Sequence, residues 1–454
     1  MQSETGILQV ISPAQVADGL KNTEYLWGLS LVDYLEQGMI EYSGRVTNRL
    51  LNTLLHRDER FEEIKVRTMT DRVEAAGLAY LESDNAWATN VLKEHGWDSE
   101  TLQPLNGTDT LKYTGPVYEL TEDQKATRLK CIEQINSKRS EDARIPEDAE
   151  NVWDVEPDPC MVVKVSLDGV GAKRQKDTRP KEVKDKTHDY IHDENDGPAD
   201  FTRAPDPKSR PKVETAVAHI EVDGKKYLFV GKNMFMACKF VLAFLLSNNL
   251  LIDRHLLFFS DGGIDIRKCV NSIFAFCPHV VVLDWFHLRK HCYECLSMAL
   301  LSGKANRALQ YEVRRRLFHI LWVGNVDGAI AYLNSLGPDK VPSAKRKYLD
   351  NLIESLRKNK DRHVIACYAM RAKLGLRISS NPVEKANDLI VSSRQKGDCM
   401  SWSRSGSWGL AAITCMYLNH EVENIHLHHT ALHEMYTDYG KIFNLKTNRY
   451  KKVA

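Results

Sequence analysis

The stretch Met161-Val-Val-Lys-Val-Ser-Leu-Asp168 alternates apolar and polar side chains from Val163 onward. An alternation with a period of two is typical of a β-strand that buries one face. Asp168 belongs to the polar set and comes last, so the pattern predicts a strand that ends at this carboxylate. A long polar loop is expected after it, from Gly169 to Lys212.

The segment after that loop predicts a β-hairpin. Two strand-like runs, residues 213–222 and 226–230, flank the pair Asp223-Gly224. This pair tolerates the positive φ angles that a two-residue hairpin turn requires. The hairpin would add two strands beside the first.

Two short apolar runs further along, Leu256–Phe259 and Val280–Leu283, predict strands that are covered on both faces. A helical run to about Leu246 precedes the first of them, and a helix over residues 264–276 separates the two. Three antiparallel strands followed by two crossover strands is the order of an RNase H-like domain. We therefore predict an α/β fold with an RNase H-like mixed five-stranded sheet.

Helical patterns surround these strands, which gives the expected domain organisation. We predict a mainly helical N-terminal domain, a linker, a catalytic core in two parts and an all-helical insertion between those parts. The boundaries are 1–138 for the N-terminal domain, 139–159 for the linker, 160–290 and 379–420 for the core, 291–378 for the insertion and 421–454 for a C-terminal tail.

Charge is unevenly distributed along the 454 residues. The whole chain has 62 basic and 61 acidic side chains, but residues 1–150 hold 16 Lys and Arg against 27 Asp and Glu. Any affinity for a phosphate backbone is therefore expected mainly in the rest of the chain. The apolar run from Phe235 to Leu246 is broken by Lys239 and is shorter than the roughly 20 residues of a membrane-spanning helix, so no membrane association is expected.

Acidic side chains follow the predicted strands. Asp168 and Asp261 would meet at one edge of the sheet, because the carboxyl ends of parallel strands lie together. In Ser379-Ser-Asn-Pro-Val-Glu-Lys-Ala-Asn387, Asn381 can cap a helix that carries Glu384 one turn in. Three carboxylates that converge can bind two Mg²⁺ ions, which promote phosphodiester displacement.

Each acid also has a structural alternative. Asp168-Gly169 could close a strand with a turn, and Asp261 precedes Gly262-Gly263, another turn sequence, with Asp265 as a nearby competitor for a ligand role. Glu384 could be the capping-box partner of Asn381.

The region from about Met161 to Leu418 resembles the DDE transposases of the Mutator-like group and allied bacterial insertion-sequence families. Its most distinctive motif is Asp284-Trp-Phe-His287, directly after the last core strand. The wide gap between Asp261 and Glu384 is similar to the gap that the family's helical insertion creates. The other motifs that carry the resemblance are Leu167-Asp-Gly-Val170, Phe259-Ser-Asp-Gly-Gly263 and Asn381-Pro-Val-Glu-Lys-Ala-Asn387.

The resemblance implies a DNA transposase that cuts transposon ends and transfers the strands into target DNA. Asp168, Asp261 and Glu384 would bind two Mg²⁺ ions, for which Mn²⁺ can substitute, with Asp284 and His287 as an accessory pair. The implied partners are transposon-end DNA, target DNA and further copies of the chain assembled on DNA. The implied location is the cytoplasm, with the nucleoid, in a bacterium or the nucleus in a eukaryote. The alternatives are an RNase H-fold nuclease without strand transfer and a domesticated DNA-binding protein.

Further side chains are candidates for DNA contact. The aromatic ones could stack on unpaired bases or could anchor their segment to the core, and the basic ones could follow a phosphate backbone or lie on solvated helix faces. The candidates are Lys385, Arg394, Lys396, Trp402, Arg404 and Trp408.

The N-terminal domain is a candidate for DNA-end binding, and residues 64–77 could form a helix-turn-helix or an ordinary packing helix. A zinc site at His287, His291 and Cys295 is a weaker alternative, as is one in the histidine-rich segment 426–433.

Overall fold

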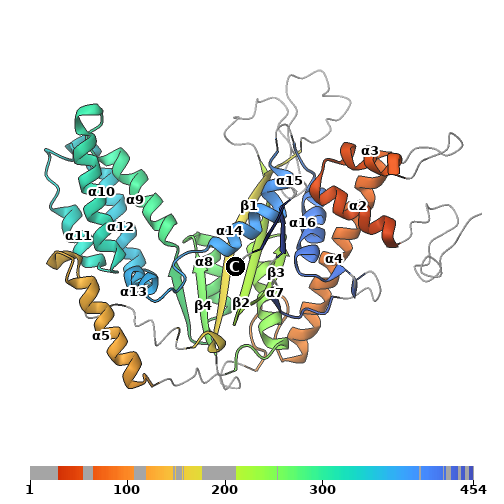
Figure 1. Ribbon diagram of the computed structural model, residues 1–454, viewed down its shortest axis with the longest axis horizontal. Coiled ribbons are helices and arrows are strands. Elements are labelled where there is room, and N and C mark those ends of the chain that lie inside the picture. Colours follow the sequence, from red (N-terminus) through yellow and green to blue (C-terminus); the bar gives the residue numbers. More distant parts are fainter. Residues whose placement is uncertain are drawn as a thin grey trace, which may run out of the picture.

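A computed structural model gives the fold of the protein (Figure 1). The structure describes residues 29–54, 65–106, 119–146, 149, 156, 158–175, 211–252, 254–397, 400–422, 424–425, 431–437, 441–444 and 449–452.

A mixed β-sheet forms the centre of the protein (Figure 1). Its strand order is β5-β4-β1-β2-β3-β6. β1, β2 and β3 pair in antiparallel fashion, whereas β4 and β5 run parallel to β1. The five predicted strands are confirmed, and a short sixth strand extends the β3 edge. The bounds are β1 Val162–Lys173, β2 Lys212–Val222, β3 Lys225–Gly231, β4 His255–Ser260, β5 His279–Leu283 and β6 Tyr436–Thr437.

The hairpin between β2 and β3 has the turn that its sequence predicts. Asp223 has a φ of 47° and Gly224 a φ of 73°, so both turn residues are left-handed. This geometry matches the twist of the paired strands. It fixes the register in which Val222 faces Lys225.

The predicted end of the first strand is wrong. β1 continues beyond Asp168 to Lys173, because β2 pairs with it along this whole extension, from Asp168 opposite Val217 to Lys173 opposite Lys212. The first residues of the predicted loop are therefore strand. The remainder of that loop, residues 176–210, lies outside the described residues.

Each face of the sheet has its own apolar core. On β1, Val163, Val165 and Leu167 pack into a core that α7 and α8 complete, whereas Val170 and Ala172 on the opposite face pack against α14 and α16. The sheet therefore has two buried faces, and the apolar positions of β1 alternate between them. The bounds are α7 Met234–Ser247, α8 Ile264–Ile273, α14 Asn381–Asn387 and α16 Arg404–Leu418.

Five α-helices separate β5 from α14 (left in Figure 1). They pack around a separate apolar core that reaches Phe259 and Val282 of the sheet. Within the described residues, no helix is both long and apolar enough to cross a bilayer. The bounds are α9 Trp285–Ala299, α10 Arg307–Trp322, α11 Val326–Asn334, α12 Arg346–Asp361 and α13 Tyr368–Lys373; α5, Glu122–Asn136, packs beside α13.

The described N-terminal residues are mainly helical, and their longest helix joins the sheet's core. α4 (Val66–Glu94) follows α2 (Leu29–Glu41) and α3 (Gly44–Leu54) and contributes Leu81 and Leu92 to the core beneath β1. α4 runs without a break through residues 66–77, so the helix-turn-helix alternative for this segment is wrong.

Gly77 allows α4 to cross α16 at close range. A Cβ atom at position 77 would lie 2.0 Å from the carbonyl oxygen of Gly409, far inside van der Waals contact. The two glycines therefore let the two backbones meet directly. This explains why a helix tolerates a residue of low helix propensity at its centre.

We predict that Gly77→Ala destabilises the protein by about 1–3 kcal/mol, because the overpacking cost exceeds the roughly 1 kcal/mol that alanine gains in a helix. Urea unfolding measures the change. Ala79→Ser, an exposed substitution two residues along the same helix, is the control and should have little effect. An increase in stability for Gly77→Ala would contradict the close crossing.

Candidate functional site

The register of β1 and β4 brings two acidic residues to the same level of the sheet. The last parallel pair is Ser166 with Phe259, and two residues further along each chain are Asp168 and Asp261. β4 ends at Ser260, where Gly262 turns the chain with a φ of 89°. Asp261 Oδ1 accepts a hydrogen bond of 2.7 Å from the backbone amide of Gly263, which orients its carboxylate.

Asp168 is in an unfavourable electrostatic environment for a carboxylate. Burial, together with the negative charge of Asp261, raises the pKa of Asp168 to about 6. Hydrogen bonds from the Gly169 amide and the Asn387 side chain, and the nearby His287, offset only part of this increase. A divalent cation between the carboxylates would relieve the repulsion.

Asp284 is fully buried and caps α9. Its Oδ1 accepts a 2.7 Å bond from the backbone amide of His287 and lies 3.1 Å from His287 Nδ1. Its Oδ2 accepts bonds from the backbone amide of Ser380 at 2.6 Å and from the Ser380 hydroxyl at 3.2 Å. Burial opposes ionisation, but these hydrogen bonds outweigh it, so the pKa of Asp284 lies below its ordinary value.

His287 lies among the acidic residues of the site. The hydrogen bond to Asp284 is the largest influence and raises the pKa of His287; partial burial opposes it, and the charges of Asp284, Glu384 and Asp261 add to the increase. His287 Nδ1 is 3.6 Å from Glu384 Oε1. A partly exposed imidazole with a raised pKa can donate a hydrogen bond or a proton to a negatively charged oxygen.

Glu384 is in the first turn of α14 and points to this group. The helix begins at Asn381 with Ser380 at the N-cap position, so the prediction that Asn381 caps it is wrong. The Ser380 hydroxyl lies 3.1 Å from Glu384 Oε1 and 3.2 Å from Asp284 Oδ2, so the two carboxylates share its single proton. Glu384 is therefore held by a hydroxyl four residues earlier and is not the capping-box partner of Asn381, which removes that structural alternative.

Two polar residues of the site were not identified from the sequence. Ser380 bridges Asp284 and Glu384, and Asn387 donates from Nδ2 to Asp168 Oδ2 at 2.7 Å. Asn387 is 5% exposed, and its Oδ1 has no hydrogen-bond partner among the described residues. The available signal was spacing, because Glu384 and Asn387 are three residues apart and share one face of a helix.

The carboxylates form two groups that have no residue in common. Among the described residues, Asp284, His287 and Glu384 are the group whose ligand atoms all lie within 4.8 Å of one another. Both oxygens of Asp284 already accept hydrogen bonds, which favours an anchoring role over metal ligation for this residue. Asp168 and Asp261 interact electrostatically, and Asp261 also influences His287, but the three predicted ligands do not form a group of that closeness in the described residues.

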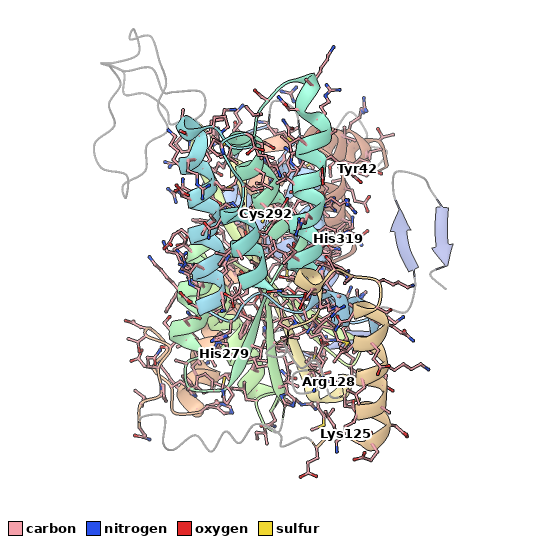
Figure 2. The ribbon with its side chains drawn as sticks, turned by 90° about the vertical axis from the view of Figure 1, so that its left-hand side faces the viewer. Tyr42, Lys125, Arg128, His279, Cys292 and His319 are labelled. Atoms are coloured by element: carbon pink, nitrogen blue, oxygen red, sulfur yellow. The ribbon has the colours of Figure 1, made fainter. Side chains whose placement is uncertain are left out.

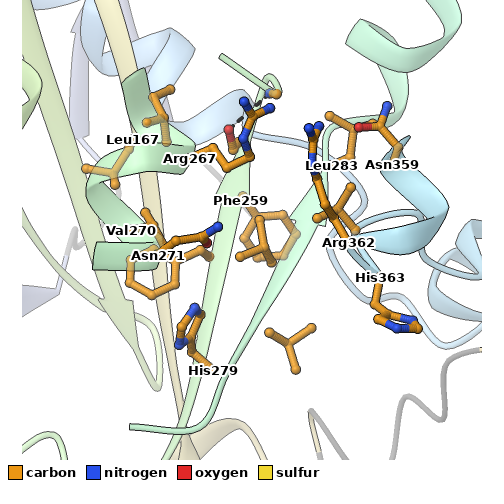
Figure 3. Close-up of a pocket in the computed structure, with 17 residues that line it drawn as sticks. Leu167, Phe259, Arg267, Val270, Asn271, His279, Leu283, Asn359, Arg362 and His363 are labelled. Atoms are coloured by element: carbon orange, nitrogen blue, oxygen red, sulfur yellow. Dashed lines mark hydrogen bonds between the residues drawn. The ribbon is translucent and has the colours of Figure 1, made fainter. Parts of the chain in front are cut away.

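A pocket of about 380 Å³ adjoins the site (Figure 3). Ser260 and Gly262, which flank Asp261, line it together with apolar residues of β4 and β5. Figure 3 shows the guanidinium groups of Arg267 and Arg362 at the same end of the pocket. These cations give the region beside Asp261 a means of binding a phosphate group.

The basic residues predicted to contact DNA differ in their exposure to solvent. Lys396 is exposed, and the side chain of Lys385 is 64% exposed and pairs with Asp388 at 3.3 Å. Arg394 is buried, and its Nε donates to the Met39 carbonyl at 2.9 Å, so its guanidinium supports the fold. Arg404 is partly exposed at the start of α16.

The two tryptophans of this region have internal partners. Trp402 Nε1 donates to the Gln395 carbonyl at 3.0 Å, and Trp408 Nε1 donates to the Glu214 carbonyl at 2.8 Å. Both rings pack against apolar cores. These contacts favour the anchoring alternative that the sequence left open.

The histidines of the zinc alternatives have other surroundings. Cys295 Sγ lies 3.9 Å from His291 Nδ1. Within the described part of the chain, however, these two residues do not belong to a group of three possible metal ligands. His433 stacks on Trp87 with ring centroids 3.7 Å apart and its Nε2 is 3.0 Å from Asp84 Oδ1. Residues 426–430 lie outside the described residues.

The raised pKa of Asp168 predicts how stability depends on pH. The folded protein binds a proton at Asp168 more tightly than the unfolded chain does, so this contribution to stability is lost as pH rises from about 4 to about 6. Asp168→Asn, which stays neutral, should be more stable than the parent at pH 7 by about 1 kcal/mol, and the difference should disappear below pH 4.

Urea unfolding in EDTA at several pH values measures this difference. Asp339→Asn, at an exposed position in the insertion, is the matched control and should show no such dependence. A parent protein that is more stable than Asp168→Asn at pH 7 would contradict the electrostatic description of the site.

The comparisons with known proteins give no assignment: no protein-family model matches the chain, and no curated protein matches it significantly in sequence.

Proposed function

We propose that the chain is a DNA transposase with an RNase H-like catalytic domain. The observation that carries the proposal is the electrostatic interaction of Asp168 with Asp261, together with His287, which is influenced by the charge of Asp261 and whose Nδ1 lies 3.6 Å from Glu384 Oε1. The strand order β5-β4-β1-β2-β3 and the helices between β5 and α14 support it, because they agree with the order that the resemblance implies.

The donor set suits a hard cation. Asp168, Asp261 and Glu384 would hold two Mg²⁺ ions, or Mn²⁺ in their place, and carboxylate oxygens are the ligands that these ions prefer. The bound ions would supply nucleophile activation and charge stabilisation for phosphodiester cleavage and strand transfer. The raised pKa of Asp168 supports this assignment, because ion binding would favour its ionised form.

The neighbouring side chains position these carboxylates. Asn387 orients Asp168, and Ser380 orients Glu384. Asp284 fixes the ring of His287, whose raised pKa suits a contact with a phosphate oxygen or protonation of a leaving 3′-oxygen. Arg267 and Arg362 would bind a phosphate next to Asp261.

The reaction defines the partners. The substrates are the ends of the transposon and a target duplex, and joining two ends requires more than one copy of the chain on DNA.

The test of this proposal incubates the protein with duplexes taken from the regions that flank its coding sequence, a target plasmid and Mg²⁺. Joined products would support transposition; cleavage without joining would support an RNase H-fold nuclease, and tight binding with neither would support a domesticated DNA-binding protein.

We predict that Asp261→Asn lowers metal-dependent cleavage at least about a thousandfold without unfolding the protein, because it removes a charged ligand. Asp265→Asn is the matched control, since Asp265 lies four residues away in the first turn of α8 and competes for the same role in the sequence. Gel assays of end cleavage measure both. Equal losses in the two variants, or loss only in Asp265→Asn, would remove Asp261 from the mechanism.

We predict that Asn387→Leu lowers cleavage about 10- to 100-fold and raises the Mg²⁺ concentration required for half-maximal activity, because Asp168 loses the donor that orients it. A titration of Mg²⁺ in the cleavage assay measures both effects. Asn351→Leu, on the exposed face of α12, should leave the titration unchanged. An unaltered Mg²⁺ requirement in Asn387→Leu would exclude the positioning role.

A further inference from the structure

A second pocket, of about 580 Å³, lies between α9 and α10 in the helical insertion. Five aromatic side chains and four arginines line it, and none of its described lining residues carries a carboxylate. The composition differs from that of the pocket beside Asp261, whose floor is mainly aliphatic and phenylalanine side chains. Aromatic rings together with uncompensated guanidinium groups require a ligand that offers both a flat surface and negative charge.

The arginines are held in place and concentrate positive charge. The Arg314 guanidinium lies 4.0 Å from the centre of the Tyr293 ring, and Arg314 Nη2 donates to the Ser297 hydroxyl at 2.8 Å. Arg314 Nε is buried and has no hydrogen-bond partner among the described residues. The Arg289 guanidinium lies 5.3 Å from the centre of the Phe318 ring. Preorganised guanidinium groups of this kind bind phosphate at a small entropic cost.

A histidine in the wall of the pocket, His319, interacts with two of its arginines. Burial, together with the charges of Arg139 and Arg315, lowers the pKa of His319 below its ordinary value. Arg139 comes from the segment after α5, and its Nη1 donates to the His319 carbonyl at 2.9 Å. Figure 2 shows His319 on the insertion above α5, which carries Lys125 and Arg128.

The tyrosines offer rings to a ligand. Tyr293 is 51% exposed and Tyr311 is 68% exposed, although both line the pocket. Exposed aromatic rings beside arginines are the usual means of binding unpaired bases, because every base has a flat face and a neighbouring phosphate. An acidic peptide would satisfy the charges but would leave these rings in water.

The same helix, α9, carries residues of both the candidate site and the pocket. His287 and Arg289 are two residues apart on this helix, which places them about 200° apart around an axis and nearly level along it. The separation across the helix is its diameter, roughly 10–12 Å with side chains. A strand that leaves the site around the first turn of α9 would reach the pocket within a few nucleotides.

We propose that this pocket binds unpaired nucleotides of a DNA strand, with bases stacked on Tyr293 and Tyr311 and phosphates bound by Arg289 and Arg314. The assignment of the strand as DNA rests on the proposed function. The pocket thus extends the binding surface beyond the carboxylates.

The test is fluorescence anisotropy of a labelled 12-residue oligothymidine with the full chain in EDTA. Tyr311→Ala should weaken binding roughly five- to tenfold through lost stacking, and Tyr311→Phe should retain parental affinity because it keeps the ring. Arg289→Ala should weaken binding and reduce the dependence of log K on log salt concentration by about one. Phe235→Ala, exposed at the start of α7, and Arg357→Ala, exposed on α12, are the matched controls and should bind like the parent.

Three results would overturn the proposal. They are parental affinity in Tyr311→Ala and Arg289→Ala, equal weakening in the two control variants, and competition by a free nucleoside triphosphate as strong as that by the oligonucleotide. Thermal melting of each variant verifies that it folds.

The outcome is separate from that of the proposed function, because the assay needs no metal and no cleavage. If the parent binds through Tyr311 but never cuts DNA, the transposase proposal fails and the pocket stands; if it cuts DNA but the tyrosine variants bind normally, the pocket proposal fails alone.

Discussion

The hydrogen bonds between Asp284 and Ser380 determine where the parts of the site lie. They join the end of β5 to the start of α14 across 96 residues of chain. Asp284 is 0% exposed, and a buried carboxylate is costly unless donors satisfy it. It receives backbone and side-chain donors from both His287 and Ser380, so moving either helix end would leave a buried charge without partners.

These hydrogen bonds keep the site residues in place although the helices α9 to α13 are inserted between β5 and α14. The backbone amide of Trp285 donates to the Ile378 carbonyl at 3.1 Å, and the Tyr368 hydroxyl donates to the Leu283 carbonyl at 2.8 Å, so both ends of the insertion are held at the same point of the sheet. Five helices can therefore form their own core without displacing Glu384. Asp168 and Asp261, in contrast, interact unfavourably, because the negative charge of Asp261 raises the pKa of Asp168. Functional sites often retain such unfavourable interactions at the expense of stability.

Much of the fold follows from local patterns in the sequence. The alternation around Val165 and the pair Asp223-Gly224 predicted the first three strands, because a period of two and a left-handed turn have few other solutions. The end of β1 could not be predicted, because it depends on pairing with β2, which is distant along the chain. The choice between a helix-turn-helix and an ordinary packing helix for residues 64–77 stayed open for a related reason, since Gly77 serves a contact with Gly409 that no local pattern reveals.

The acids of the candidate site were proposed from the sequence, whereas the residues that support them were not. Asp261 and Asp284 each follow a strand directly, which is visible in one sequence, whereas Asn387 and Ser380 gain their roles only from the contacts that α14 makes. For Arg394 the sequence suggested a role that the structure does not support. A basic residue near Glu384 suggests DNA contact, but the Arg394 side chain is buried and donates to the Met39 carbonyl. Charge alone does not tell whether a side chain points outward.

Anomalous diffraction from crystals soaked in Mn²⁺ tests the central claim most directly, because it locates the ions without relying on turnover. The account predicts two anomalous peaks, each within coordination distance of carboxylate oxygens from Asp168, Asp261 or Glu384, with Asp284 still bound to Ser380. A single ion held by Asp284, His287 and Glu384, with Asp168 and Asp261 empty, would contradict it.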